Sequence, residues 1–182
     1  ELNLDDTVTY KASNKQYASA EMKNYKVGDK VSLRNLVKYV ITVSDNTAHS
    51  ILVDYIGFQT LKNYGKSLGA TSTLVGGDNF GTMNVHDAII YITKLDELIN
   101  KDVTLGSELQ SYFVNSDQNY LNFPEENIQA AQKYGQYEIY YHENGIVYTP
   151  NKYYVSILTS EGQNKYGFEK VIRNINTKVY EL

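Results

Sequence analysis

The sequence predicts an α+β protein in which helices come first and an antiparallel sheet follows. Apolar residues recur with a helical period over residues 31–116. The period then changes, and residues 127–182 hold three runs rich in β-branched and aromatic side chains before a last helical stripe. Helices followed by sequential strands are typical of the α+β class. We expect a single domain over residues 1–182 that contains these two parts.

The helices are predicted from apolar stripes and capping residues. Residues 1–30 are polar and are expected to be extended chain and loops, with one strand-like run at residues 7–10. Ser32 and Asn84 are expected to be N-caps, and Gly57 is expected to follow a helix C-terminus. The five predicted helices of this part span residues 33–43, 48–56, 58–68, 85–98 and 107–113.

Three strands are predicted in the second part, over residues 128–134, 137–148 and 152–159. Tight turns or bulges at residues 135–136 and 149–151 are expected to join them. A final helix is predicted from about residue 165 to residue 180, because apolar residues recur there at helical spacing.

Composition excludes several classes of protein. The 17 basic residues are spread along the chain against 21 acidic ones, so no clustered positive surface for a nucleic acid is expected. No apolar run approaches the length of about 20 residues that crosses a membrane. The chain has no cysteine, and its three histidines are isolated, so we expect no metal and no cofactor.

Ser44, Asp45 and Asn46 occupy a tight break between two strongly amphipathic helices. Such a break can hold polar side chains at the rim of a cleft. The competing interpretation is an ordinary helix cap, in which Ser44 or Asn46 accepts a hydrogen bond from a backbone N–H.

Lys133, Tyr134 and Gly135 lie at the end of the first predicted strand. A lysine there can bind a substrate carboxylate, and a glycine lets a substrate backbone approach the strand edge. The competing interpretation is a surface lysine beside a bulge.

Taken together, the two pieces resemble the second and third motifs of the serine β-lactamase and penicillin-binding family, of the class A-like kind. That family carries Ser-x-x-Lys, Ser-Asp-Asn and Lys-Thr-Gly or Lys-Ser-Gly in chain order. The run from His142 to Tyr148 and the strand that ends at Thr159 resemble the segment around its third motif. The resemblance covers nearly the whole chain. It implies a class A β-lactamase/DD-peptidase-like fold, with a helical region and an antiparallel sheet flanked by helices.

The resemblance also implies roles for individual residues. Ser44 would relay a proton to the leaving nitrogen, and Lys133 would polarise Ser44 and bind the substrate carboxylate region. Asn46 would bind the substrate's side-chain amide. Asp45 would point inward and support the turn. Three further residues of the strand would face the substrate, with the backbone N–H of the last in the oxyanion hole: Tyr134, Gly135 and Gln136.

Three departures from the family pattern limit what can be carried over. No Ser-x-x-Lys occurs upstream of Ser44, so we expect a domain that is incomplete at its N-terminus and lacks the N-terminal strands and the nucleophile helix. Either an upstream segment or a second copy would then complete the sheet, the latter by self-association. Tyr134 replaces a small hydroxyl residue and would crowd the groove. No Glu-x-x-Leu-Asn stands between residues 74 and 83, so a deacylation base is not recognisable.

The sequence therefore predicts a serine hydrolase domain that attacks β-lactam or D-Ala peptide amides through an acyl-serine intermediate, and that is inactive as this fragment. The alternative is a non-catalytic relative that binds cell-wall peptides or partner proteins. The expected partner is a β-lactam or a peptidoglycan peptide. The expected location is outside the cytoplasm of a bacterium, in a secreted or surface-anchored protein.

Overall fold

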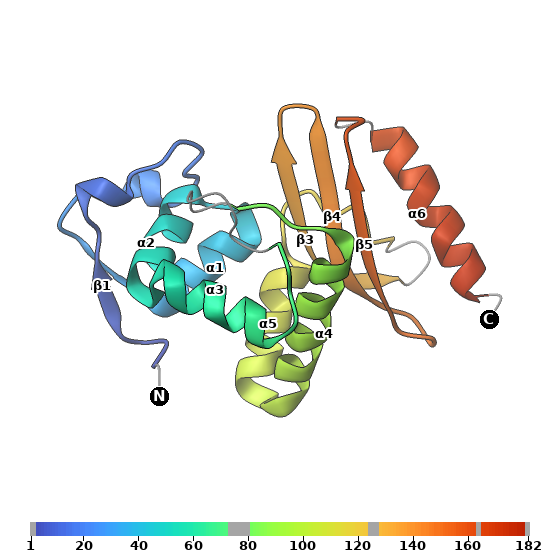
Figure 1. Cartoon of the computed structure of the whole chain (residues 1–182), viewed down its shortest axis with the longest axis horizontal. Helices are drawn as coiled ribbons and strands as arrows, with labels where there is room; N and C mark the ends of the chain where they lie inside the picture. The colour runs from blue at the N-terminus through green and yellow to red at the C-terminus, as the bar shows by residue number, and fades with distance from the viewer. Residues whose placement is uncertain (1–2, 73–80, 124–127, 163–164, 181–182) are drawn as a thin grey trace. The chain divides into compact units, whose positions relative to one another are not determined.

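The computed structural model describes residues 3–72, 81–123, 128–162 and 165–180. The chain separates into two compact units, residues 1–83 and 84–182, and each is described by itself (Figure 1). The boundary falls inside the helical region that the sequence predicted. The expectation of a single domain over the chain stays a prediction.

The first unit consists of a small sheet and three helices. Strand β1 pairs antiparallel with strand β2, and two short 3₁₀ turns lie between them. The elements are β1 (Thr7–Thr9), β2 (Lys30–Ser32), α1 (Leu33–Val43), α2 (Asn46–Ile56) and α3 (Phe58–Ser67). Side chains from β2, from α1, from α2 and from the second 3₁₀ turn form one buried cluster, which includes Val31, Leu36, Ile51 and Met22. Because the cluster joins both helices to β2, it holds the ends of α1 and α2 on either side of the break between them.

The helix ends of the first unit agree with the capping residues read from the sequence. The Ser32 side chain accepts a hydrogen bond from the Asn35 N–H at 3.2 Å, as expected for an N-cap. Gly57 has φ of 90°, a conformation that favours glycine, and it ends α2 and precedes α3. Strand β2 was not predicted, because its partner β1 lies more than twenty residues away in the sequence.

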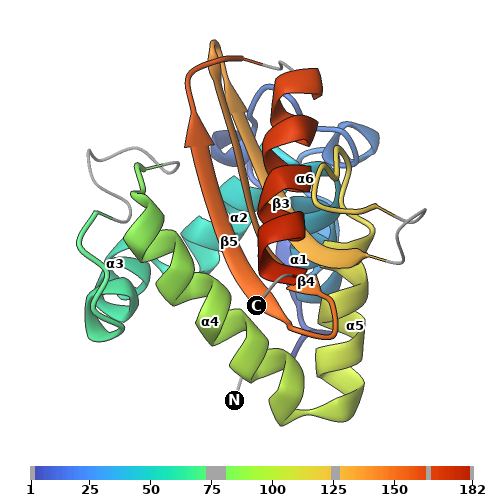
Figure 2. The same ribbon diagram turned by 90° about the vertical axis from the view of Figure 1, so that its right-hand side faces the viewer.

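The second unit is a three-layer arrangement around a three-stranded antiparallel sheet of order β3-β4-β5. Its elements are α4 (Val85–Lys101), α5 (Val103–Val114), β3 (Gln129–Tyr137), β4 (Tyr140–Tyr148), β5 (Tyr153–Thr159) and α6 (Lys165–Tyr180). Helices α4 and α5 cover one face of the sheet, where Ala131 and Ile146 are buried. Helix α6 and the segment 115–123 cover the other face, where Tyr141 and Val147 are buried (Figure 2).

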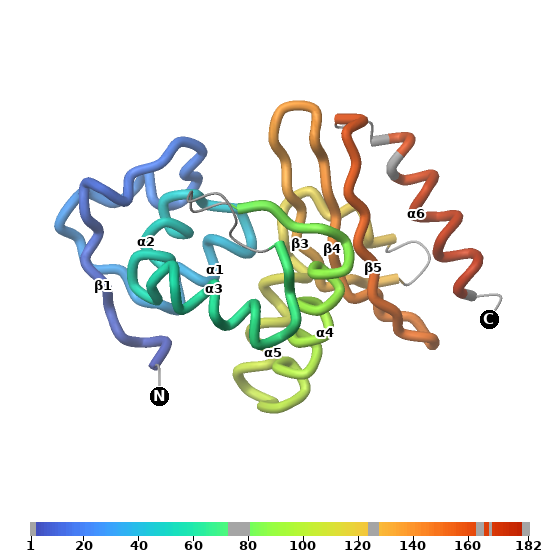
Figure 3. Tube along the Cα trace, in the orientation of Figure 1, coloured from blue at the N-terminus to red at the C-terminus, as the bar shows by residue number. Residues whose placement is uncertain are grey.

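Two predicted boundaries in this unit were wrong. Residues 135–136 are not a turn: Gly135 pairs with His142 inside the ladder, and the hairpin turns at residues 138–139, where Glu138 has φ of 51° (Figure 3). Helix α5 begins four residues before the predicted start, because the Asp102 side chain caps it by accepting the N–H groups of residues 104 and 105. The prediction of three sequential antiparallel strands is confirmed.

Within the described ranges of the chain, none of the helices has both the length and the apolar composition needed to cross a membrane.

Candidate functional site

Ser44 lies in a left-handed backbone conformation at the end of α1. Its φ of 53° and ψ of 43° are costly for a residue with a side chain, by about 1–2 kcal/mol. The peptide N–H groups of Ser44 and of the next residue both point to the carbonyl of Tyr39, the latter at 3.2 Å. A strained serine that the surrounding structure holds in place is the kind of position found at functional sites.

The buried carboxylate of Asp45 supports this turn through hydrogen bonds to main-chain N–H groups. Its side chain is 0% exposed, and Oδ1 accepts the N–H of Ala48 at 2.9 Å as the N-cap of α2. Oδ2 accepts the N–H groups of Glu21 at 2.8 Å and of Met22 at 2.9 Å. The carboxylate thus ties two separate segments to the turn, and the inward orientation expected for Asp45 is confirmed.

A segment far away in sequence runs along the same turn. The Asn46 side-chain amide donates to the carbonyl of Tyr17 at 3.0 Å. Thr47 accepts the N–H of Gln16 at 2.9 Å, and its hydroxyl lies 2.5 Å from that of Ser19. Asn46 and Ser44 therefore lie in one turn whose shape depends on residues 16–22.

Lys133 lies on β3, and its side chain is half-buried. Its Nζ donates to the carbonyl of Tyr134 at 2.7 Å and lies 3.9 Å from the centre of the Tyr134 ring. Burial lowers the pKa of Lys133 to about 8, and the charges of Glu143 and Asp117 act in the opposite direction. An ammonium with a lowered pKa can bind an anion or exchange a proton near neutral pH.

The other three predicted residues follow Lys133 on the same strand. Tyr134 pairs with Glu143 across the ladder, and its ring stacks on that of Tyr141 with centres 6.4 Å apart. A Cβ built on Gly135 would meet its nearest atoms, in His142, at 3.9 Å, so the glycine here is not required by close packing. Gln136 is exposed and pairs with Tyr141.

The predicted residues thus form two groups. Ser44 and Asn46 lie together in one turn of the first unit, and the four residues from Lys133 to Gln136 lie together on β3 of the second unit. Hydroxyl, amide and ammonium groups in these two groups are suited to binding a carboxylate and moving a proton.

Glu143 is a buried acid that the sequence analysis did not single out. It is 0% exposed, and its Oε1 accepts the hydroxyl of Tyr141 at 3.0 Å. Burial raises the pKa of Glu143 to about 8, while the Tyr141 hydroxyl, the Tyr120 N–H and the Lys133 charge lower it. The available signal was its position: it alternates with Tyr141 and Val147 on the buried face of β4.

A second polar cluster joins α4 to β5. Asp96 accepts hydrogen bonds from Lys152 Nζ at 2.5 Å, from the Tyr154 hydroxyl at 2.8 Å and from the Asn100 amide at 3.2 Å. Burial would raise the pKa of Asp96, but these donors and the Lys152 charge together hold it below its ordinary value. This cluster binds a helix to the sheet.

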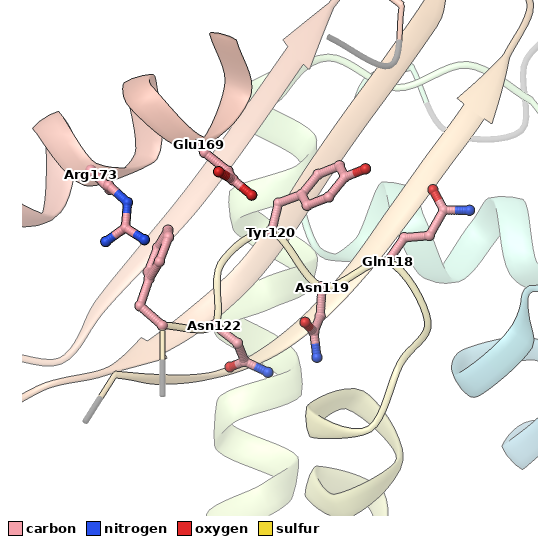
Figure 4. Close-up of a pocket in the computed structure, with 7 residues that line it drawn as sticks. Gln118, Asn119, Tyr120, Asn122, Glu169 and Arg173 are labelled. Carbon is pink, nitrogen blue, oxygen red and sulfur yellow. The ribbon is translucent and has the colours of Figure 1, made fainter. Parts of the chain in front are cut away.

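A cavity of about 410 Å³ opens between α6 and the segment before β3 (Figure 4). Arg173 and Glu169 line it from α6, and the Arg173 guanidinium lies 4.3 Å from the Phe123 ring centre. Tyr120 lines the cavity and also contacts Tyr141, with ring centres 5.2 Å apart. In the part of the chain that the structure describes, no three histidine or acidic side chains gather as metal ligands would.

A sequence profile described as the beta-lactamase enzyme family matches residues 1–182. The chain belongs to the beta-lactamase enzyme family. As a member of this family with a mixed helix and antiparallel-sheet fold, it is a serine-hydrolase-like domain. A search of curated protein sequences found no match.

Solved structures of this family share its fold. Penicillin-binding protein PBP-A is similar with a TM-score of 0.86 at 16% identity, over 100% of this chain and 74% of that chain. A PBP-A mutant in an acyl-enzyme complex with penicillin G gives 0.86 at 17% identity over the same shares. A β-lactamase from Sphaerobacter thermophilus gives 0.78 at 18% identity, over 100% of this chain and 76% of that chain. The predicted class A β-lactamase fold is therefore confirmed.

Proposed function

We propose that this protein performs acyl-serine chemistry on the amide of a β-lactam or of a D-Ala peptide. The observation that carries the proposal is the Ser44 turn, in which a strained serine is held by a fully buried carboxylate in a chain of the beta-lactamase enzyme family. Left-handed residues are common at helix C-termini but are usually glycine or asparagine, so the serine at this position is the unusual feature.

In the proposed reaction, a serine oxygen attacks the amide carbonyl carbon and the carbon–nitrogen bond then breaks. Ser44 passes a proton to the leaving nitrogen, and the Lys133 ammonium binds the substrate carboxylate region. Residues 1–182 contain no Ser-x-x-Lys, and the attacking serine is not one of the residues named here. The named groups of this chain bind, orient and protonate the substrate.

The remaining site residues receive binding roles. Asn46 has one amide hydrogen bonded to Tyr17 and offers its other groups to the side-chain amide of the substrate. Gly135 leaves room for a substrate at the edge of β3. Packing within the protein does not require a glycine here, because a Cβ would meet its nearest atoms at 3.9 Å, so the absence of a side chain would serve the substrate. The Gln136 N–H contributes to the oxyanion hole, and Tyr134 contacts the substrate beside Lys133.

The substrate class is supported by a relative and by the charge of the site. The PBP-A mutant of similar fold was solved as an acyl-enzyme with penicillin G. Both a penicillin and a D-Ala peptide end in a carboxylate, which suits a lysine such as Lys133. We also place the protein outside the cytoplasm of a bacterium, where a peptidoglycan peptide is accessible; similar structures include β-lactamases from Sphaerobacter thermophilus and Bacteroides cellulosilyticus.

A non-catalytic, peptide-binding relative is the second candidate. The observation in its favour is Tyr134, whose ring packs on Tyr141 and under the Lys133 ammonium where the family pattern has a small hydroxyl residue. Such a protein would still bind the carboxylate of a peptide at Lys133 but would not cleave an amide bond.

The test is acylation by a fluorescent penicillin of the protein expressed from its native gene, followed by intact-protein mass spectrometry. We expect a serine-linked adduct whose rate of formation falls about a hundredfold or more in Lys133→Ala and in Ser44→Ala. Lys94→Ala, which removes an exposed lysine paired with Glu97 on α4, is the matched control and should leave the rate unchanged. Binding without an adduct supports the second candidate, and neither binding nor an adduct refutes both.

A further inference from the structure

Glu143 lies directly opposite Tyr134 in the β3–β4 ladder, beside the lysine of the proposed site. A buried carboxyl group is costly unless its oxygens are hydrogen bonded. Oε1 accepts the Tyr141 hydroxyl, and the Tyr120 N–H also donates to the carboxyl group. Oε2 has no hydrogen-bond partner in the described part of the chain. Packing alone does not explain this acid, because an apolar side chain would fill the same volume without the cost.

Two tyrosine rings connect Glu143 to Lys133. The Lys133 ammonium lies 3.9 Å from the centre of the Tyr134 ring. That ring is stacked on Tyr141, with an angle of 9° between the planes, and the Tyr141 hydroxyl bonds to Glu143 at 3.0 Å. The lysine, the two rings and the acid therefore form one continuous series of contacts across two neighbouring strands.

The charges of Lys133 and Glu143 favour one another. Burial moves the pKa of both groups to about 8, downward for the lysine and upward for the acid. Because opposite charges attract, the Glu143 carboxylate raises the pKa of Lys133 and the Lys133 ammonium lowers the pKa of Glu143, each against the effect of burial. Asp117 supports the charge of Lys133 in the same way.

Other ionisable groups around the acid come from each neighbouring element. Tyr141 of β4 bonds to it, and burial together with Glu143 raises the pKa of Tyr141. Tyr120 of the segment before β3 donates its N–H. From α6, Glu169 and Arg173 face the cavity that Tyr120 lines. Lys133 is the cation whose charge lowers the pKa of Glu143.

We propose that Glu143 is a positioning residue that holds Lys133 over the Tyr134 ring and keeps its amine protonated. The role rests on the proposed function, in which Lys133 binds the substrate carboxylate. Glu143 itself touches no substrate in this scheme. It acts through the Tyr141–Tyr134 ring pair and through its charge.

The test measures the titration of Lys133 directly in the full chain, without any substrate. Each lysine amine is labelled in competition with acetic anhydride from about pH 6 to about pH 11, a range that spans ordinary and lowered lysine pKa values, and is read by peptide mass spectrometry. In Glu143→Gln we expect the pKa of Lys133 to fall by roughly half a unit to one unit, or about three- to tenfold less ammonium at a given alkaline pH. Glu143→Asp should recover part of the shift.

Gln132→Met is the matched control. Gln132 is 1% exposed and lies on the same face of β3 as Tyr134. Its Oε1 accepts the Leu121 N–H at 2.9 Å, so it also joins the segment 115–123 to the sheet. Its loss should leave the titration of Lys133 unchanged. An equal shift in Gln132→Met, or no shift in Glu143→Gln, overturns the proposal.

Tyr141→Phe serves as a second variant if Glu143→Gln does not fold by circular dichroism. It keeps the ring and removes the hydroxyl that favours ionised Glu143, so the pKa of Lys133 should again fall; an unchanged value counts against the proposal. Acylation gives the separate answer on function. A shift in Lys133 titration in a protein that no penicillin acylates supports the role of Glu143 and refutes only the proposed function.

Discussion

Replacing Asp45 tests the support of the Ser44 turn. The carboxylate accepts three backbone N–H groups, those of Ala48, Glu21 and Met22, at 2.8–2.9 Å. Asp45→Ala leaves all three without this acceptor, and each buried donor that loses its partner costs about 1–3 kcal/mol. The three losses would sum to about 3–9 kcal/mol. Because the Glu21 N–H is only partly buried, we expect about 3–6 kcal/mol, a large part of the roughly 5–15 kcal/mol that stabilises a typical domain. Asp45→Asn keeps one acceptor oxygen and should lose about 1–3 kcal/mol.

The free energies of unfolding can be measured by equilibrium urea denaturation, followed by the far-ultraviolet circular dichroism of the helices. Asp54→Asn is the matched control, because Asp54 is an exposed carboxylate whose partner is Lys11 Nζ at 2.8 Å. An exposed ion pair contributes about 0–1 kcal/mol, so this variant should unfold nearly as the wild type does. If Asp45→Asn is no less stable than Asp54→Asn, the carboxylate does not support the turn and the reasoning is refuted.

Three further predictions concern backbone conformation, close packing and pH. Ser44→Gly should leave the free energy of unfolding unchanged or raise it by up to about 1 kcal/mol, because it removes left-handed strain, while acylation falls about a hundredfold with the hydroxyl; a clear loss of stability in urea would contradict this. Gly145→Ala should cost about 1–3 kcal/mol or more, since its Cβ would lie 2.7 Å from the Ala131 carbonyl oxygen, whereas Gly135→Ala has room and should change thermal unfolding little. Asp96 has a lowered pKa in the folded state, so the stability it contributes is present at neutral pH and is lost as the pH falls below about 4. The unfolding free energy should therefore differ less between neutral and acid pH in Asp96→Asn than in the wild type. An equal difference in the two proteins would show that Asp96 does not contribute this pH dependence.

Helices and caps were the most predictable part of the fold, because their signals lie within a few residues of one another. Ser32 and Asn84 were identified as N-caps, and both accept the expected N–H group. The hairpin turn was missed because Gly135 and Gln136 look like turn residues, whereas the actual turn places Glu138 at a positive φ. Strand pairing decided the outcome there, and pairing is a non-local effect.

The candidate site was predictable only as two local groups. Asp45 and Lys133 could be identified by motif, but the motif does not show which main-chain groups a carboxylate binds or how deeply a lysine is buried. Glu143 shows the limit most clearly. Its two-residue alternation with apolar neighbours predicts an inward side chain, yet only the ladder register shows that it lies opposite Tyr134. The energetic meaning of a buried acid depends on that partner.

Residues 16–22, which run along the Ser44 turn, have a consequence for the order of folding. The contacts of Asp45 with Glu21 and Met22 and that of Asn46 with Tyr17 join residues more than twenty positions apart. Closing a loop of that length costs entropy before its contacts form, so such contacts tend to form later than the helices on either side. Helices α1 and α2 can therefore be present while the serine between them is still free to leave its left-handed conformation. The final geometry of this turn is reached only when residues 16–22 pack against it. Hydrogen exchange should therefore show the amides of Glu21, Met22 and Ala48 becoming protected together.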